Sequence, residues 1–269
     1  MGLELTRGGS LRPAGSFFEL DGQQVSRYVW VSQLVVGPML LDAGCGHGYG
    51  SAYLAERGSM DVLGIDSDED AIAFAKANYQ GNNVMFLSSD VAMLPLKSEV
   101  FDSVVSFEVI EHLDDPQIFL SEVRRVLKVG GVLVLSTPNR DVTRKLDREG
   151  RPVNPFHVHE FSRDELLTLL QQFFVVEEAY LQSTPFAYRT LAKHYNYLDS
   201  CKVPLVVRRF VPSRIKDEWL KRKGCLLEST RGMWREFKIL PTKGLPDSTI
   251  LFPTQLYRCR KESVRGNTN

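Results

Sequence analysis

Short apolar stretches alternate with amphipathic stretches over most of the chain. The apolar stretches cover residues 39–42, 61–66, 84–87, 101–108 and 132–136, and three of them end in an acidic residue. Apolar runs of about four to eight residues between turn residues are typical of buried strands. Because such strands alternate here with helix-like segments, the pattern predicts an α/β fold with a largely parallel sheet.

Helix boundaries are marked between the predicted strands. Asp115 followed by Pro116 is typical of a helix start, and the Gly130-Gly131 pair predicts the end of that helix. An apolar stripe between them gives the helix one buried face. Ser162 and Glu165 have the spacing of a capping box, which predicts a further helix.

Three more elements complete the predicted fold. Ser67 begins a helix after the second strand, with Asp70 at capping-box spacing. Residues 174–181 predict a sixth strand, and residues 249–259 can close the sheet as a last, antiparallel strand despite Pro253. An amphipathic helix over residues 21–36 either covers the mouth of a ligand site or simply packs on the sheet.

The first strand breaks into alternating glycines at positions 44, 46, 48 and 50. Glycine tolerates positive backbone angles and, lacking Cβ, lets the chain approach a ligand closely. A helix predicted over residues 51–57 offers free N–H groups at its start. The spacing matches neither the dinucleotide fingerprint nor the P-loop. The turn therefore predicts a nucleotide or cofactor site of another kind.

Composition narrows the class of protein. The 269 residues are 43% apolar with a formal net charge of zero, which gives no global attraction to nucleic acid or anionic membrane. The four cysteines are scattered without a C-x-x-C pair, so neither zinc nor a disulfide framework is expected. We find no signal pattern and no apolar run long enough to span a bilayer, and expect a soluble cytoplasmic protein.

Three motifs together resemble the class I S-adenosylmethionine-dependent methyltransferases, in their small-molecule branch. They are D-x-G-x-G-x-G at 42–48, F-D-x-V-x-x-x-x-V-I-E-H-L at 101–113 and L-K-V-G-G-V-L-V-L-S-T-P-N at 127–139. The resemblance covers residues 38–140. It implies a Rossmann-like, doubly wound, seven-stranded sheet, mostly parallel with an antiparallel last strand, and S-adenosyl-L-methionine as cofactor, converted to S-adenosyl-L-homocysteine.

Within that resemblance, two acids have expected roles. Asp66, at the tip of the second strand, is suited to accepting hydrogen bonds from ribose hydroxyls, although it can also simply cap the next helix. Asp90 can accept from an adenine amino group while Val91 supplies an apolar face. The expected cofactor-binding residues are Asp42, Gly44, Cys45, Gly46, Gly48, Asp66, Ser67, Asp90, Val91, Phe107, Glu108 and His112.

Residues 154–161 resemble an N-P-[FY]-H-V-x-E-[FY] element of methyltransferases found among sugar and polysaccharide enzymes. There the element lies near the acceptor side. His157, His159 and His112 are therefore the candidate catalytic bases, since an unperturbed histidine titrates near neutral pH. In an extended segment His157 and His159 share one face. A metal would need further ligands, and because no neighbouring cluster supplies them we expect no metal.

Residues 183–247 depart from a minimal methyltransferase. This stretch is rich in arginine, lysine and aromatic residues, and we expect a mainly helical insertion that acts either as a lid or as a solvated cap. The predicted organisation is an N-terminal segment and helix (1–36), a core with the cofactor site (37–182), the insertion (183–247), and a final strand and tail (248–269).

The expected function is methyl transfer to a small polar acceptor, such as a hydroxyl of a sugar, a nucleotide-sugar or a related metabolite. Quinone-type and natural-product acceptors, methylated on O, C or N, are the alternative, and a non-catalytic cofactor-binding protein is another. Zero net charge and the absence of an N-P-P-[YF] motif argue against a nucleic-acid substrate. The sequence leaves a homo-oligomer open.

Overall fold

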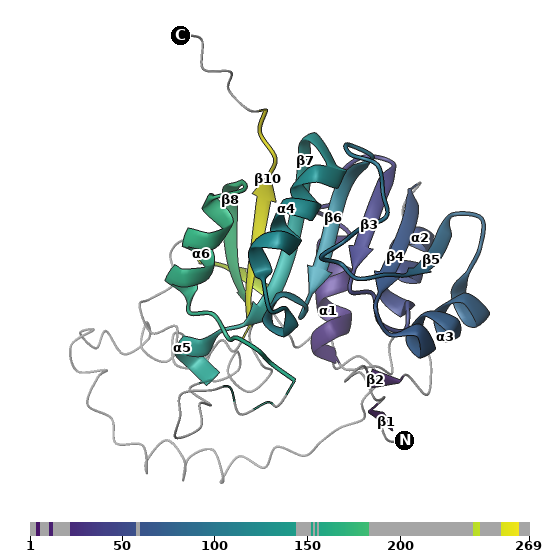
Figure 1. Ribbon diagram of the computed structural model, residues 1–269, viewed down its shortest axis with the longest axis horizontal. Coiled ribbons are helices and arrows are strands. Elements are labelled where there is room, and N and C mark those ends of the chain that lie inside the picture. The colour runs from purple at the N-terminus through teal and green to yellow at the C-terminus, as the bar shows by residue number, and fades with distance from the viewer. Residues whose placement is uncertain are drawn as a thin grey trace, which may run out of the picture.

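The computed structural model describes residues 4–5, 11–12, 22–57, 60–143, 152, 154, 156–182, 239–242 and 254–263. Within them, eight strands form one sheet in the order β5-β4-β3-β6-β7-β10-β8-β9 (Figure 1). Their bounds are β3 Met39–Ala43, β4 Asp61–Asp66, β5 Val84–Ser88, β6 Phe101–Phe107, β7 Leu127–Pro138, β8 Val175–Gln182, β9 Ile239–Pro241 and β10 Thr254–Arg260. Strands β1 Glu4–Leu5 and β2 Leu11–Arg12 form a separate antiparallel pair.

The half of the sheet from β5 to β7 is parallel. Its central strands are buried on both faces, which explains why they appear in the sequence as continuous apolar runs. The chain begins this half with β3, which lies between β4 and β6. Strand order therefore reverses at β3, and in open α/β sheets the crevice at such a point binds ligands.

The other half is antiparallel. Strand β10 lies between β7 and β8 and runs opposite to both. The seven expected strands are present with the expected antiparallel last strand, and the short β9 adds an eighth strand beside β8. The C-terminal strand thus lies inside the sheet and not at its edge.

Helices cover both faces of the sheet. One apolar core includes side chains of α4 and α6, and a second includes side chains of α1, α2 and α3. Figure 1 shows α4 and α6 in front of the sheet. The helices are α1 Gly22–Val31, α2 Tyr49–Arg57, α3 Glu69–Tyr79, α4 Pro116–Val126, α5 Arg140–Thr143 and α6 Arg163–Gln171, with a 3-10 turn η2 at Ile110–His112.

The sequence signals for helix starts and ends were partly confirmed. The Asp115 side chain caps α4 with Pro116 in its first turn, and Ser162 forms the expected capping box with Glu165. The predicted cap of α3 was wrong by one residue, because Asp68 and not Ser67 accepts from the first free N–H groups. Helix α1 ends at Val31, earlier than residue 36.

The predicted end of α4 at Gly130-Gly131 was also wrong. The helix ends at Val126 and the chain passes directly into β7 at Leu127. Gly130 adopts a φ of 81° within that strand, and its N–H donates to the Lys261 carbonyl at 2.8 Å. The glycines therefore shape a strand rather than end a helix.

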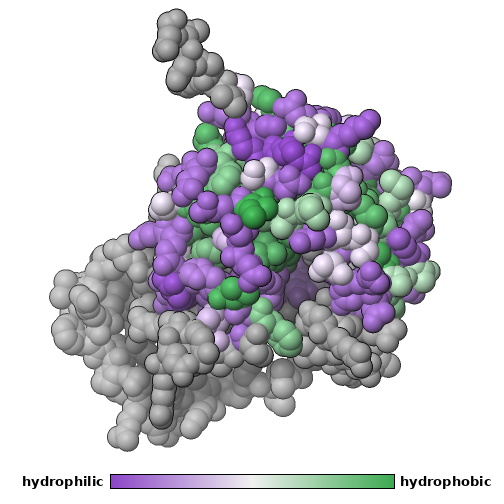
Figure 2. Space-filling model, viewed as in Figure 1, coloured by the Kyte–Doolittle hydropathy of each residue, from purple (hydrophilic) through white to green (hydrophobic). Residues whose placement is uncertain are grey.

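Most of the predicted insertion 183–247 lies outside the described residues, and its role stays a prediction, as does the division of the chain into four segments. Among the described helices, none is both long and apolar enough to cross a membrane. Most of the coloured surface in Figure 2 is hydrophilic, with hydrophobic residues in small groups.

Candidate active site

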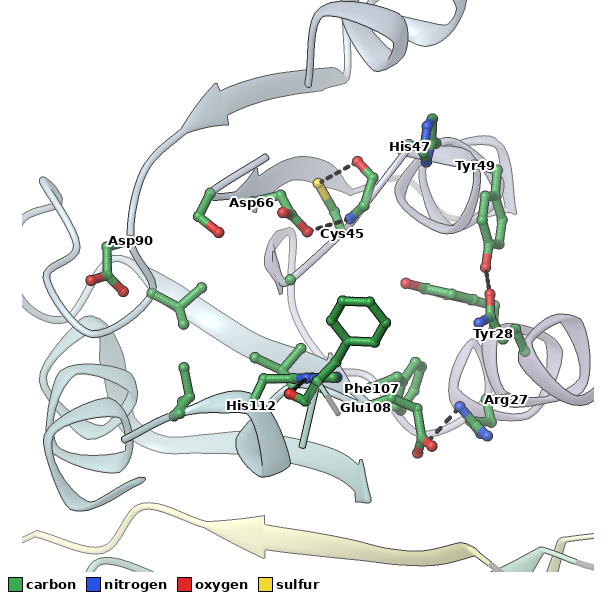
Figure 3. A pocket seen from close by; sticks show the side chains of 18 residues that line it. Arg27, Tyr28, Cys45, His47, Tyr49, Asp66, Asp90, Phe107, Glu108 and His112 are labelled. Atoms are coloured by element: carbon green, nitrogen blue, oxygen red, sulfur yellow. Dashed lines mark hydrogen bonds and ion pairs between the residues drawn. The ribbon is translucent and has the colours of Figure 1, made fainter. Parts of the chain in front are cut away.

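A cavity of about 460 Å³ is formed by the loops that follow β3, β4, β5 and β6, together with α1. It lies at the point where strand order reverses, the usual ligand position in such sheets. Figure 3 shows Asp66 and Cys45 along one side and Phe107, Glu108 and His112 along the other. The described residues that line it are Gln24, Arg27, Tyr28, Gly44, Cys45, Gly46, His47, Tyr49, Asp66, Ser67, Asp90, Val91, Phe107, Glu108, Val109, His112, Leu113 and Phe156.

The glycine turn after β3 forms the base of the cavity. Gly44 has a φ of 83°, and a Cβ at this position would overlap the Val109 side chain on the facing wall. The N–H groups of Gly44 and Cys45 donate to the Ile65 carbonyl at 2.7 and 2.9 Å, which binds the turn to the end of β4. Gly44 therefore allows two loops to approach each other at the cavity.

Asp42 lies beneath this turn and does not line the cavity. Its side chain is 0% exposed and accepts from the Ser51 hydroxyl at 2.6 Å and the Tyr28 hydroxyl at 3.2 Å. Burial raises the pKa of the Asp42 carboxyl to about 7, although these two hydrogen bonds oppose the shift. The residue links β3 to α1 and α2 behind the expected cofactor position.

Asp66 is the last residue of β4, Asp90 follows the adjacent strand β5, and both line the cavity. The Asp66 carboxylate accepts from the Gly46 N–H at 2.7 Å and from the Asp68 N–H at 3.0 Å. One oxygen of Asp90 accepts from the Ala92 N–H at 2.8 Å. A carboxylate oxygen accepts more than one hydrogen bond, so both acids keep capacity for a ligand.

The opposite wall carries a charged pair. Arg27 is buried, and its Nη1 lies 3.4 Å from Glu108 Oε1. Ser136 donates to the same Glu108 oxygen at 2.8 Å. Glu108 adopts a φ of 56°, which is rare for a residue with a side chain and is found more often at functional sites.

His112 is the candidate base that lines the cavity. Its Nδ1 lies 2.7 Å from the Phe156 carbonyl, which can only accept, so Nδ1 carries the proton and Nε2 has a lone pair. His157 lies beside it with ring centroids 5.0 Å apart, but it does not line the cavity. Its Nδ1 lies 2.9 Å from Glu160 Oε1, and its Nε2 lies 2.8 Å from the Asn154 amide nitrogen.

His159 lies in different surroundings. Its side chain is 48% exposed, its ring packs edge-on against Phe161, and its Nε2 is 3.9 Å from Glu165. The His157 N–H donates to the Asn154 carbonyl in a turn, so the segment is not the extended strand that would place both histidines on one face. The structure groups His157 with His112 and separates His159 from them.

Most of the expected cofactor-binding residues line the cavity together with other residues, and their roles stay predictions. Every expected cofactor residue except Asp42 and Gly48 lines it, and Gly48 packs against Ala75 and Phe86 instead. The amphipathic pattern of residues 21–36 hinted at the contribution of α1. His47, Val109, Leu113 and Phe156 lie within motifs quoted from the sequence, but the sequence gave them no role in the site. The additional lining residues are Gln24, Arg27, Tyr28, His47, Tyr49, Val109, Leu113 and Phe156.

Comparison with known proteins agrees with this geometry. Residues 41–135 match the family model described as "Methyltransferase domain". A Mycolicibacterium smegmatis protein described as "Probable S-adenosylmethionine-dependent methyltransferase" is 42% identical over 144 residues, which are 54% of each chain. The ubiquinone biosynthesis O-methyltransferase of Coxiella burnetii is 34% identical over 133 residues, 48% of this chain and 56% of that one.

The chain spans about half the length of these curated relatives. Among solved structures, Haemonchus contortus phosphoethanolamine N-methyltransferase 2, in complex with S-adenosyl-L-methionine, is similar with a TM-score of 0.53 at 16% identity. That match covers 88% of this chain and 52% of the other. At this identity the likeness concerns the fold alone.

Proposed function

The chain belongs to the class I S-adenosylmethionine-dependent methyltransferase family, and on this basis we propose that it methylates a small polar acceptor in the cavity beside His112. One observation carries the proposal. The glycine turn after β3, Asp66 at the end of β4 and Asp90 after β5 meet around a single cavity. Residues this far apart in sequence form a continuous surface for an extended ligand.

The residues present fit S-adenosyl-L-methionine. Asp66 accepts from the ribose hydroxyls, and Asp90 with Val91 binds the adenine. The glycine turn, which a Cβ at Gly44 would obstruct, accommodates the methionine part. When bound, the cofactor supplies an electrophilic methyl group on its sulfonium.

The chain itself contributes binding, orientation and control of a proton on the acceptor side. Phe107, Glu108 and His112, which are also expected to contact the cofactor, line the wall opposite Asp66, and the Phe156 carbonyl holds the His112 ring in one tautomer. A fixed acceptor geometry can lower a barrier of this kind by about 7–11 kcal/mol in the best cases. An acceptor hydroxyl also has to lose its proton, for which the His112 lone pair is available.

A hydroxyl of a sugar or nucleotide-sugar is the acceptor we favour, supported by the resemblance of residues 154–161. A quinone-type acceptor is the second candidate, supported by the identity to the Coxiella burnetii O-methyltransferase. Incubating the protein with labelled cofactor and representatives of both acceptor classes separates the two. Cofactor binding without label transfer to any acceptor would favour a non-catalytic binding protein.

Cofactor binding is tested by Asp66→Ala with Asp68→Ala as its matched control. Asp66 lines the cavity, whereas Asp68 caps α3 two residues further along. Because Asp66→Ala removes charged hydrogen bonds, it should weaken the binding of S-adenosyl-L-homocysteine and of S-adenosyl-L-methionine alike. Calorimetry should show both affinities reduced by about tenfold or more. Asp68→Ala should lower the free energy of unfolding by about 0.5–2 kcal/mol and keep the affinity. Equal affinities in the two variants would contradict the assigned site.

A further inference from the structure

A cluster of potential metal ligands lies next to the cavity wall, with Glu111 buried, His157 half-buried and His112 exposed. Glu111 and His112 belong to η2, and His157 belongs to the segment that follows Phe156. One potential ligand atom from each of these three residues lies within 4.8 Å of the other two. We propose that Glu111, His112 and His157 bind a divalent first-row transition-metal ion that contacts the acceptor.

Glu111 provides the first argument. Its side chain is 0% exposed, and Thr137 donates to Oε2 at 2.9 Å. Among the described residues, Oε1 has no hydrogen-bond partner. Protonating Glu111 at Oε1 would not supply the missing hydrogen bond, because the buried O–H group would then lack an acceptor. An unpaired buried carboxylate oxygen is costly, and a bound cation would satisfy it.

The two histidines provide the second argument. The Nδ1–H of His112 donates to the Phe156 carbonyl, and the Nδ1–H of His157 donates to the Glu160 carboxylate. In metal sites, a ligating histidine almost always donates its other N–H to a carbonyl or carboxylate in this way. Both rings therefore keep an Nε2 lone pair. At His157 the amide nitrogen of the exposed Asn154 contacts the Nε2 lone pair. A bound cation would take the place of this amide.

Backbone hydrogen bonds assemble the cluster from two distant segments. The N–H groups of Val158 and His159 both donate to the Glu111 carbonyl, at 2.9 and 3.1 Å. This attachment holds His157 beside η2. The ligand positions are thus built by the fold and need little rearrangement to accept an ion.

Charge around the cluster favours a cation. Three carboxylates lie at the cluster, those of Glu108, Glu111 and Glu160; among the described residues, Arg27 lies 3.4 Å from Glu108 and Arg140 donates to the Glu160 carbonyl at 3.3 Å. A divalent ion would balance this excess of negative charge.

The donor set indicates the class of metal. Two imidazole nitrogens with one carboxylate suit zinc, iron, cobalt or manganese, whereas magnesium and calcium prefer oxygen ligands alone. Three protein ligands leave coordination positions for water or an acceptor oxygen. Because His112 lines the cavity, those positions lie next to the acceptor space.

The consequence for the reaction rests on the proposed function. A cation here would lower the pKa of an acceptor hydroxyl, which selects an oxygen acceptor. His112 would then be a metal ligand instead of the base, so the hydroxyl proton passes to water and the oxygen forms a bond to the methyl carbon. The carbon–sulfur bond breaks with its electron pair on sulfur, giving S-adenosyl-L-homocysteine.

Metal binding is tested on the full chain after treatment with a chelator, by calorimetry with Zn²⁺ and by visible absorption with Co²⁺. The wild-type protein should bind one ion per chain, with Co²⁺ showing a ligand-field band. Glu111→Gln and His157→Gln should each weaken binding by at least about tenfold. The control His159→Gln changes an exposed histidine two residues from His157 and should keep wild-type stoichiometry and affinity.

Folding and the methyl-donor site are checked in the same samples through S-adenosyl-L-homocysteine affinity. Retained affinity in Glu111→Gln with lost metal binding supports the metal site. A wild-type protein that binds S-adenosyl-L-homocysteine but no Zn²⁺ or Co²⁺ overturns the metal proposal alone. Binding of metal without the nucleoside would instead refute the proposed function. Unchanged metal affinity in both cluster variants would also overturn the site.

Discussion

At the scale of single residues, the same residue type serves different purposes at equivalent strand ends. Asp42 is the last residue but one of β3 and Asp66 is the last residue of β4, yet Asp42 is enclosed by Ser51 and Tyr28 whereas Asp66 faces the cavity. The difference arises because α1 and α2 close over the end of β3. Enclosure changes the protonation of Asp42 and thereby the pH dependence of folding.

Asp42→Asn should reveal that dependence. The pKa of Asp42 is about 7 in the folded protein against an ordinary value of 3.8. Between these values the folded state holds more protons than the unfolded state, so stability is greatest below the lower value and falls as pH rises. Asparagine has no such proton. Urea unfolding should show wild-type stability falling relative to the variant from about pH 4 to about pH 7, by up to about 1.4 kcal/mol per pH unit. A constant difference would contradict the burial argument.

At the scale of elements, the contact between α1 and α2 positions one wall of the cavity. Tyr28 of α1 packs over Gly50 of α2, and a Cβ at position 50 would overlap the Tyr28 ring. The same ring makes edge contacts with Tyr49 and Phe107 at centroid distances of 5.8 and 5.1 Å. Gly50 therefore determines how closely the two helices approach.

Gly50→Ala tests this contact, with Gly81→Ala as control. Alanine normally stabilises a helix by about 1 kcal/mol relative to glycine, so a net loss must come from overpacking. We expect about 1–3 kcal/mol of lost stability and weaker S-adenosyl-L-homocysteine binding, because α1 lines the cavity. A Cβ at Gly81 meets its nearest atoms at 3.9 Å, so that variant should behave like wild type in both measurements. Stabilisation by Gly50→Ala would show that α1 packs elsewhere.

At the scale of the whole molecule, the sheet depends on the last described strand. Strand β10 joins β7 to β8, so residues near the end of the chain connect the two halves of the fold. Leu256 in this strand is 0% exposed and pairs with Ser136 and Tyr180 on its two sides.

Leu256→Ala should destabilise the protein by about 2–5 kcal/mol, since it leaves a cavity inside the sheet. Val129→Ala, at a side chain 54% exposed on β7, should stay within about 0.5 kcal/mol of wild type. The free energy of unfolding of both variants is measured by urea unfolding, with circular dichroism as the signal. A small effect of Leu256→Ala would mean that β10 is not part of the cooperative unit.

The sequence alone determined the features that depend on neighbouring residues. Each parallel strand was visible as an apolar run, and the residue at its carboxyl end was visible with it. Since the carboxyl ends of parallel strands share one edge, the positions of Asp66 and Asp90 followed without any knowledge of packing. The glycine turn was equally local, because its backbone angles depend on the absence of a side chain.

Only the tertiary structure decided which groups are buried together. The enclosure of Asp42, the contribution of α1 to the cavity, and the grouping of Glu111 with His157 all join segments that are distant along the chain. The sequence placed Glu111 in a motif without giving it a role, and it gave only a slight preference for His157 over His159. Hydrogen bonds from the 158–159 backbone to the Glu111 carbonyl distinguish them, and no periodicity in the sequence encodes such a long-range contact.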